Sequence, residues 1–168
     1  KLGIPNGIMG LYTASGEVRV NGELLDLSRL GEALHHKVAF VSEDRRGVGL
    51  LLDESIEKNI VFSAMQVNND FFHKYGWIRL HNGSATRRHA EEMVKKLDIR
   101  CTGIRQMAGR LSGGNQQKVC LARALTLNPE ILFVSEPTRG IDIGAKKLVL
   151  EYLVKLNREQ GMTVIVVS

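Results

Sequence analysis

The sequence predicts an α/β domain with a mainly parallel sheet, a small antiparallel edge and an inserted helical subdomain. Short apolar runs of strand length occur at residues 38–41, 131–134 and 163–167. The last two flank a segment with helical periodicity, and continuous apolar strands around a helix are typical of parallel pairing with both sheet faces covered. Between residues 53 and 110 the strand-like patterns vanish, which indicates the helical insert.

The composition is that of one globular domain. The chain has 168 residues, 43% of them hydrophobic and 24% charged, which suffices for a single buried core. No apolar stretch approaches the roughly 20 residues that a membrane-spanning helix needs, and the first residues lack a signal-peptide pattern. The net charge of +5 comes from basic residues interleaved with acids, so we expect no nucleic-acid partner.

An antiparallel edge is expected near the beginning of the chain. Residues 15–25 alternate between polar and apolar side chains, with Val18 and Val20 facing inward. Asn21-Gly22 has the composition of a two-residue hairpin turn.

The remaining segments are predicted from their periodicity. Within the insert, apolar residues recur at helical spacing at Ala90, Met93, Val94 and Leu97. Residues 55–62 and 103–110 are predicted to form helix or loop. After residue 134 a second helix is expected to end at Gly161. Its apolar face comprises Ala145, Leu148, Val149, Tyr152, Leu153 and Leu156.

Cysteine and histidine spacing gives no sign of a metal centre. Cys101 and Cys120 lie in separate segments, without a second cysteine or a patterned histidine nearby, which favours reduced thiols. The histidines show no metal-ligand spacing.

A Ser-Gly-Gly sequence directly before a helix-forming segment is the first candidate for chemistry. Ser112, Gly113 and Gly114 precede residues 117–125, which are rich in helix formers. Unpaired N–H groups and the positive end of the helix dipole favour an anion such as phosphate there, and glycines allow close approach of the backbone. The tetrapeptide alone is equally compatible with an ordinary serine N-cap.

Charged residues also follow two of the predicted strands. Glu136 comes at the carboxyl end of the strand at 131–134, the position where open α/β sheets place ligand chemistry. A charged loop at residues 42–47 follows the strand at 38–41 and is a second candidate site.

The segments at 111–125 and 131–146 closely resemble the signature and Walker B segments of ABC ATPases. Residues 136–146, Glu-Pro-Thr-Arg-Gly-Ile-Asp-Ile-Gly-Ala-Lys, look like those of sugar importers of the ribose, galactose and arabinose type. In that family one polypeptide holds two cassettes, and the loop at 42–46 is similar to that of the second one. There, Glu43 occupies the position of the Q-loop glutamine.

The resemblance implies roles for particular residues. Residues 1–168 would form part of an ABC-ATPase cassette, and the helical subdomain would lie at about residues 53–110. The signature loop would clamp ATP phosphate in trans in a cassette dimer, and Glu136 would be the catalytic base. The implied signature residues are Ser112, Gly113, Gly114 and Gln116, and the D-loop-like residues are Gly140 and Asp142.

The resemblance also implies cofactors and partners. ATP and Mg²⁺ are expected in the assembled transporter. The expected partners are a second nucleotide-binding cassette, transmembrane permease subunits and, indirectly, a sugar-binding receptor protein. The chain would then be peripheral, on the cytoplasmic face of the inner or plasma membrane.

Two departures from the family pattern bear on activity. Ser135 stands where the Walker B aspartate is expected, so metal binding there should be weak. These 168 residues also contain no Gly-x-x-x-x-Gly-Lys followed by Ser or Thr, the loop that cradles the β and γ phosphates. We therefore expect a truncated cassette that binds ATP poorly and is inactive alone.

Two other interpretations remain open from the sequence. One is a degenerate, non-hydrolysing regulatory cassette, which Ser135 and the missing phosphate loop favour. The other is an ABC ATPase of the DNA-repair type, which is disfavoured because the insert lacks sustained heptads.

Overall fold

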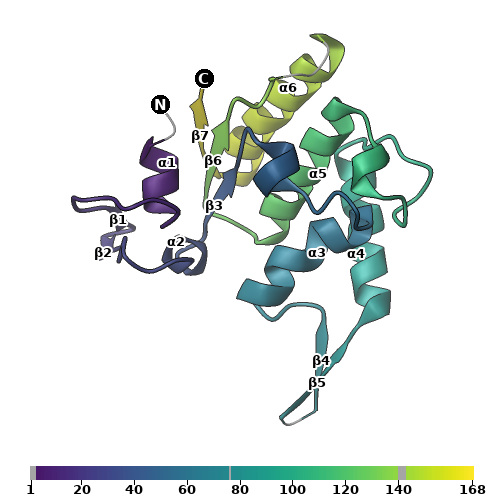
Figure 1. Ribbon diagram of the computed structural model, residues 1–168, viewed down its shortest axis with the longest axis horizontal. Coiled ribbons are helices and arrows are strands. Elements are labelled where there is room, and N and C mark those ends of the chain that lie inside the picture. Colours follow the sequence, from purple (N-terminus) through teal and green to yellow (C-terminus); the bar gives the residue numbers. More distant parts are fainter. Residues whose placement is uncertain (1–2, 76, 140–142) are drawn as a thin grey trace.

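The computed structural model describes residues 3–75, 77–139 and 143–168. At its centre lies a parallel sheet of β3 (Val38–Val41), β6 (Ile131–Ser135) and β7 (Thr163–Val167), in the order β3-β6-β7 (Figure 1). Val38 pairs with Ile131, which in turn pairs with Thr163. The parallel arrangement predicted for the runs at 131–134 and 163–167 is therefore confirmed, and the buried strand predicted at 38–41 joins the same sheet.

Helix α6 (Ile143–Gln160) connects β6 to β7 and ends before Gly161, whose φ of 67° suits the left-handed position after a helix. Val149, Leu153 and Leu156 are buried, as predicted. Leu148, which was predicted on the same apolar face, is 48% exposed. The apolar stripe that reaches the core is narrower than the periodicity suggested.

β7 also departs from the expectation that both faces of the sheet are covered. It is the end strand of the described sheet, and Ile165 and Val166 are exposed to 39% and 47%. Period-2 alternation puts these neighbours on opposite faces, so neither face of β7 is fully covered by the described residues.

Two helices pack against each other beside the sheet. They are α3 (Ile56–Val67) and α5 (Gly113–Thr126), and they share a core with Ile56, Ile60 and Val119 fully buried. α4 (Gly83–Lys96) packs on α3, which confirms the helix predicted around Ala90 and Met93. Short helical turns, η1 (Arg45–Gly49) and η2 (Ala108–Arg110), precede α3 and α5.

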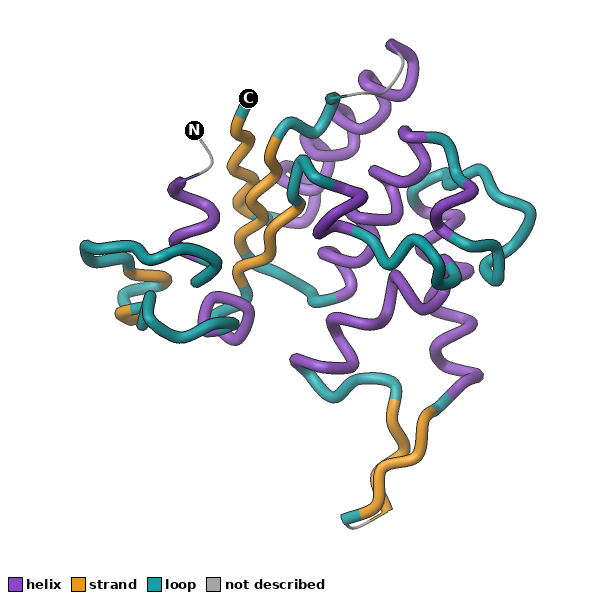
Figure 2. The backbone as a smooth tube through the Cα atoms, in the orientation of Figure 1, coloured by secondary structure: helices purple, strands orange, loops and turns teal. Residues whose placement is uncertain are grey.

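The N-terminal part forms a small layer of its own beside the parallel sheet (Figure 2). It consists of α1 (Gly3–Ile8), β1 (Arg19–Val20), β2 (Glu23–Leu24) and α2 (Glu32–His35). Asn21 and Gly22 have φ values of 53° and 87°, as a type I′ turn requires, so the predicted hairpin is confirmed. The hairpin is a separate two-stranded sheet and not a hydrogen-bonded edge of the parallel one.

The insert between residues 53 and 110 is not wholly helical, which corrects the expectation. β4 (Phe72–Tyr75) and β5 (Ile78–His81) form an antiparallel hairpin between α3 and α4, and it projects from the body (Figures 1 and 2). Histidine, lysine and arginine at its strand positions hid the alternation from the sequence pattern. Among the described helices, none has the length and apolar character needed to cross a membrane.

Candidate functional site

Ser112 is the N-cap of α5, with extended backbone angles of φ −62° and ψ 156°. Its side chain is exposed, and its Oγ accepts hydrogen bonds from Asn115 Nδ2 at 3.0 Å and Asn115 N at 3.5 Å. Asn115 Oδ1 in turn accepts from the backbone N–H of Arg100. The serine hydroxyl is therefore held in place at the surface, with its own proton free to be donated.

The first turn of α5 opens onto a pocket of about 460 Å³. Unpaired N–H groups at a helix N-terminus and the helix dipole give such a pocket a positive potential. The side chain of Arg100 adds charge, because it has no partner among the described residues, whereas Lys118 Nζ is bound to the carbonyl of Asp98 at 2.6 Å. The lining residues are Asp98, Arg100, Ser112, Gly114, Asn115, Lys118, Gly144 and Leu148.

Gln116 lies differently from the other signature residues. Its side chain is 3% exposed, and its Nε2 donates to the carbonyl of Ala108 at 3.2 Å. It thus ties the start of α5 to η2 and points away from the exposed loop. Its position favours a supporting role over direct contact with a ligand.

Arg45 connects the charged loop after β3 to the signature segment. Its Nη1 donates to the carbonyl of Gly113 at 3.0 Å. The sequence placed Arg45 in a candidate loop but gave no sign that it would hold the first residue of α5. The only available signal was the density of charge at residues 43–46.

The end of β6 presents two unusual features. Ser135 is 1% exposed, and its Oγ has no hydrogen-bond partner among the described residues. Glu136 has a φ of 44°, which is uncommon for a residue with a side chain and is frequent at functional sites. Its N–H donates to Val167 at 2.8 Å, while its half-buried carboxylate is bound to no described residue.

Glu43 is brought to the same end of the sheet. Its Oε2 lies 3.4 Å from Arg139 Nη1, three residues after Glu136. Glu43 is 23% exposed and Arg139 is 67% exposed, so solvent screens this ion pair. Loop residues 43–45 therefore contact both the segment after β6 and the start of α5.

The described residues do not by themselves form a magnesium site. No group of three His, Cys, Asp or Glu side chains is arranged to hold a metal ion within the described ranges. Ser135 is neutral and buried, and Glu43 is already paired with Arg139. Gly140 and Asp142, the D-loop-like residues, lie outside the described residues.

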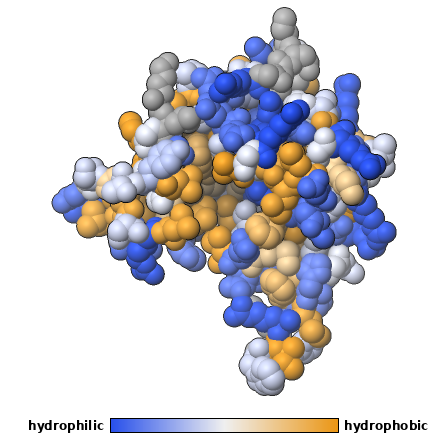
Figure 3. All heavy atoms as spheres, in the orientation of Figure 1, coloured by the Kyte–Doolittle hydropathy of each residue, from blue (hydrophilic) through white to orange (hydrophobic). Residues whose placement is uncertain are grey.

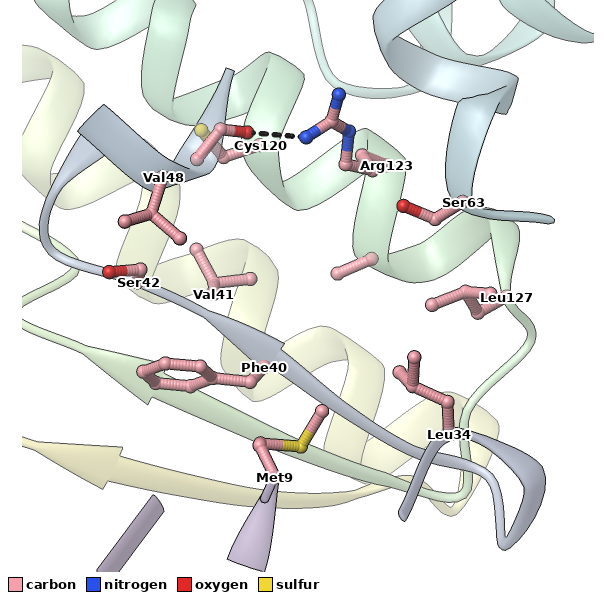
Figure 4. Close-up of a pocket in the computed structure, with 12 residues that line it drawn as sticks. Met9, Leu34, Phe40, Val41, Ser42, Val48, Ser63, Cys120, Arg123 and Leu127 are labelled. Carbon is pink, nitrogen blue, oxygen red and sulfur yellow. Dashed lines mark hydrogen bonds between the residues drawn. The ribbon is translucent and has the colours of Figure 1, made fainter. Parts of the chain in front are cut away.

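A second cavity, of about 170 Å³, lies between β3, η1, α3 and α5 (Figure 4). Most of its lining is apolar, including Phe40, Val41 and Leu127. Arg123 also borders it, and each of its guanidinium nitrogens is occupied: two bind Asn59 and the third donates to Gly49 at 2.8 Å. The remaining polar side chains of the lining are the hydroxyls of Ser42 and Ser63, so the described lining offers no free charged group to a nucleotide.

Comparison with known proteins assigns this arrangement to a family. Residues 4–139 match the model of the ABC transporter family, and the chain belongs to that family. It is 41% identical over 162 residues to a ribose/galactose/methyl galactoside import ATP-binding protein of Halalkalibacterium halodurans, covering 96% of this chain and 30% of that protein.

Other relatives are similar in kind. The chain is 36% identical to the ribose import ATP-binding protein RbsA of Caldanaerobacter subterraneus, covering 96% of this chain and 31% of the relative. It is 39% identical to the xylose import ATP-binding protein XylG of Thermoanaerobacter pseudethanolicus, covering 91% and 29%. The chain thus spans about a third of the length of these curated relatives.

Solved structures support the same fold. One is a dimeric ATP-binding cassette in a post-hydrolysis state with ADP and Pi, with a TM-score of 0.75, 27% identity and coverage of 98% of this chain and 68% of that one. A dimeric bacterial ABC transporter cassette gives a TM-score of 0.76 at 28% identity, with the same coverage. The predicted ABC cassette fold is therefore confirmed.

Proposed function

We propose that this chain is part of the ATP-binding component of a carbohydrate importer, and that its signature loop closes over the phosphate of an ATP held by a second cassette. The observation that carries the proposal is the exposed N-terminus of α5, where Ser112 is fixed beside an open pocket that also receives Arg100. On this proposal the phosphate-binding loop that cradles the same ATP belongs to the second cassette.

The comparisons support a dimeric arrangement and a sugar cargo. A related cassette with ADP and Pi is dimeric, and the relatives are named for ribose, galactose and xylose import. The partners we propose are a second cassette, permease subunits and, indirectly, a sugar-binding receptor. The chain would be peripheral at the cytoplasmic face of the membrane.

Glu136 is the residue we propose to orient and deprotonate the attacking water. It stands at the carboxyl end of a core strand, and no described residue competes for its carboxylate. Mg²⁺ is expected to accompany ATP in the assembled site. Because this chain's described residues do not form a site for it, the proposed roles of Ser112 and Glu136 involve only their own hydrogen bonds.

A non-hydrolysing cassette is the second candidate function. Ser135 favours it, because a neutral buried hydroxyl replaces the expected aspartate. Such a cassette would still clamp ATP for its partner. The two candidates differ in whether Glu136 is needed for turnover.

The experiment is an ATPase and ATP-retention assay on the transporter assembled from the complete protein and its permease. Ser112→Arg should lower ATP hydrolysis about a hundredfold, because it blocks the phosphate pocket and removes a donor to the phosphate. Ser84→Arg is the matched control, since Ser84 is exposed on α4 and makes no side-chain hydrogen bond with a described residue. Unchanged hydrolysis in Ser112→Arg would exclude clamping through this loop.

Glu136→Gln separates the two candidates. If the cassette is hydrolytic, the transporter carrying Glu136→Gln should still bind ATP but should no longer hydrolyse it. If the cassette is regulatory, ATP hydrolysis at the site of the second cassette should be unchanged in this variant.

A further inference from the structure

The β4–β5 hairpin carries apolar side chains that nothing in the described structure covers. Trp77 at its tip is 92% exposed, Tyr75 63%, Leu80 55% and Ile78 43%. A single exposed apolar residue is ordinary, but four on one projecting ribbon form a patch that marks a contact surface. Figure 3 shows apolar side chains extending along this projection.

The strand register sorts these side chains onto one face. Tyr75 pairs with Ile78, and His73 pairs with Leu80, so these four positions share a face. The ring centroids of His73 and Tyr75 are 6.2 Å apart, as expected for neighbours on the same face. The alternate pairs place Arg79 on the other face, where its guanidinium donates to Asn69. The hairpin is therefore an amphipathic ribbon.

The charge of this part of the chain has one sign. Residues 71–90 contain no Asp or Glu, and the nearest acids in sequence are Asp70 and Glu91. The same segment holds Lys74, Arg79, Arg87 and Arg88 together with three histidines. Arg87 and Arg88 are exposed on α4, the helix that begins after the hairpin. A cationic surface next to exposed aromatic side chains is complementary to an anionic interface.

We propose that the β4–β5 hairpin is a membrane-contact element, which places Trp77 and the apolar face in the headgroup region of an anionic lipid bilayer. Tryptophan and tyrosine are enriched at that depth because an amphipathic ring suits it, and basic residues beside them attract anionic headgroups. A nucleic acid could pair its phosphates with the basic side chains, but the apolar side chains of Ile78 and Leu80 would then remain in contact with phosphate or water. The lipid surface accounts for both features.

The hairpin is placed so that this contact is compatible with the candidate nucleotide site. It projects from the end of the molecule opposite to the one where the chain termini and the C-terminal ends of β6 and β7 lie (Figure 1). A membrane contact there leaves Ser112 and Glu136 open. The inference does not depend on the proposed function, because lipid binding needs no nucleotide.

Trp77 is the only tryptophan of the chain, so its fluorescence reports on the hairpin alone. The chain is titrated, without nucleotide, with vesicles of phosphatidylcholine and with vesicles that also contain phosphatidylglycerol. The anionic vesicles should shift the emission to shorter wavelength, and lipids brominated on the acyl chains should quench it. No shift with either vesicle would overturn the proposal, as would a shift produced by duplex DNA but not by lipid.

Variants compared by vesicle co-sedimentation assign the binding to the hairpin. Arg79→Gln should weaken binding to anionic vesicles about fivefold, the effect of one basic residue near the surface. Trp77→Ala should weaken it about tenfold through lost apolar burial. The controls are Lys147→Gln and Leu30→Ala, which remove an exposed charge and an exposed apolar side chain elsewhere and should bind like the wild type. Equal losses in the controls would contradict the proposal.

Discussion

Arg45 donates a hydrogen bond of 3.0 Å to the carbonyl oxygen of Gly113, the first residue of α5. Two residues earlier in the same loop, Glu43 pairs with Arg139 after the end of β6. The loop after β3 therefore contacts both candidate segments, the signature loop and the strand end that carries Glu136. A change in this loop can be transmitted to either one.

The Arg45 contact predicts an effect on the clamping of ATP. Arg45→Ala should lower the ATPase activity of the assembled transporter about tenfold, because a charge-assisted hydrogen bond contributes about 1.5 kcal/mol and here fixes the first turn of α5. Arg46→Ala is the control, since Arg46 is exposed and has no partner among the described residues. Equal activities of the two variants would show that the contact is dispensable.

Ser135 should be a site where the removal of a polar atom does not destabilise the fold. Its buried Oγ is without a described partner, so Ser135→Ala should leave the free energy of unfolding unchanged or raise it by about 1 kcal/mol. Urea unfolding followed by circular dichroism measures this. A loss of stability would indicate that the hydroxyl has a partner in solution.

The sequence predicted most of the parallel sheet because its strands are continuous apolar runs of the right length. Residues 131–134 and 163–167 are separated by a helical pattern, and such a unit has few topologies open to it. The β4–β5 hairpin was missed because its strands are exposed. An exposed strand accepts polar residues such as His73 and Arg79 as readily as apolar ones. The sequence of this hairpin therefore lacks the regular alternation of polar and apolar residues that marks a half-buried strand.

The sequence allowed the residues of the candidate site to be proposed, but it did not predict which of them contact one another. Ser112 and Glu136 could be proposed as candidates because a loop before a helix and the end of a buried strand are recognisable from the local sequence. The contact between Arg45 and Gly113 joins residues 68 positions apart, and no local pattern encodes it. The buried position of Gln116 likewise depends on Ala108 in a neighbouring turn.

The two cysteines should differ sharply in reactivity. Burial raises the pKa of the Cys120 thiol to about 12, so almost none of it is thiolate at neutral pH. Cys101 is only partly buried. Iodoacetamide should therefore modify Cys101 in the folded chain and Cys120 only in denaturant, as peptide mass spectrometry can establish. Equal native labelling of both would contradict the buried position of Cys120.

His89 should make the stability depend on pH in the mildly acidic range. Burial lowers its pKa below the ordinary value of 6.5, against the opposing effects of Glu92 and Asp70. The folded state thus binds fewer protons than the unfolded state between its lowered pKa and 6.5. The contribution of His89 to stability is complete above pH 6.5 and is lost as the pH falls through that window.

A substitution separates His89 from the other histidines. In the fold its Nε2 lies 3.0 Å from Thr126 Oγ1, whose own proton goes to the carbonyl of Ala122. His89→Gln should flatten the fall in melting temperature below pH 6.5, and His35→Gln, at an exposed position, should not. An unchanged pH profile in His89→Gln would assign the dependence to other groups.

Arg123 should be one of the most sensitive positions for stability. Its Nε donates to the carbonyl of Asn59 at 2.8 Å, its Nη2 to Asn59 Oδ1 and its Nη1 to the carbonyl of Gly49. Asn59 is itself fully buried and bonds to both the N–H and the carbonyl of Leu51. One guanidinium thus holds α3, α5 and η1 together.

Replacing Arg123 by methionine keeps much of the apolar stem but leaves the carbonyls of Asn59 and Gly49 without this donor. Unpaired buried polar groups destabilise by about 1–3 kcal/mol each, so the free energy of unfolding should fall by about 3 kcal/mol. Arg158→Met, at an exposed position on α6, is the matched control and should change it by less than about 0.5 kcal/mol. Urea unfolding monitored by circular dichroism compares the two. If Arg123→Met were as stable as the control, water would have to replace all three hydrogen bonds, and the junction of the three helices would not depend on the arginine.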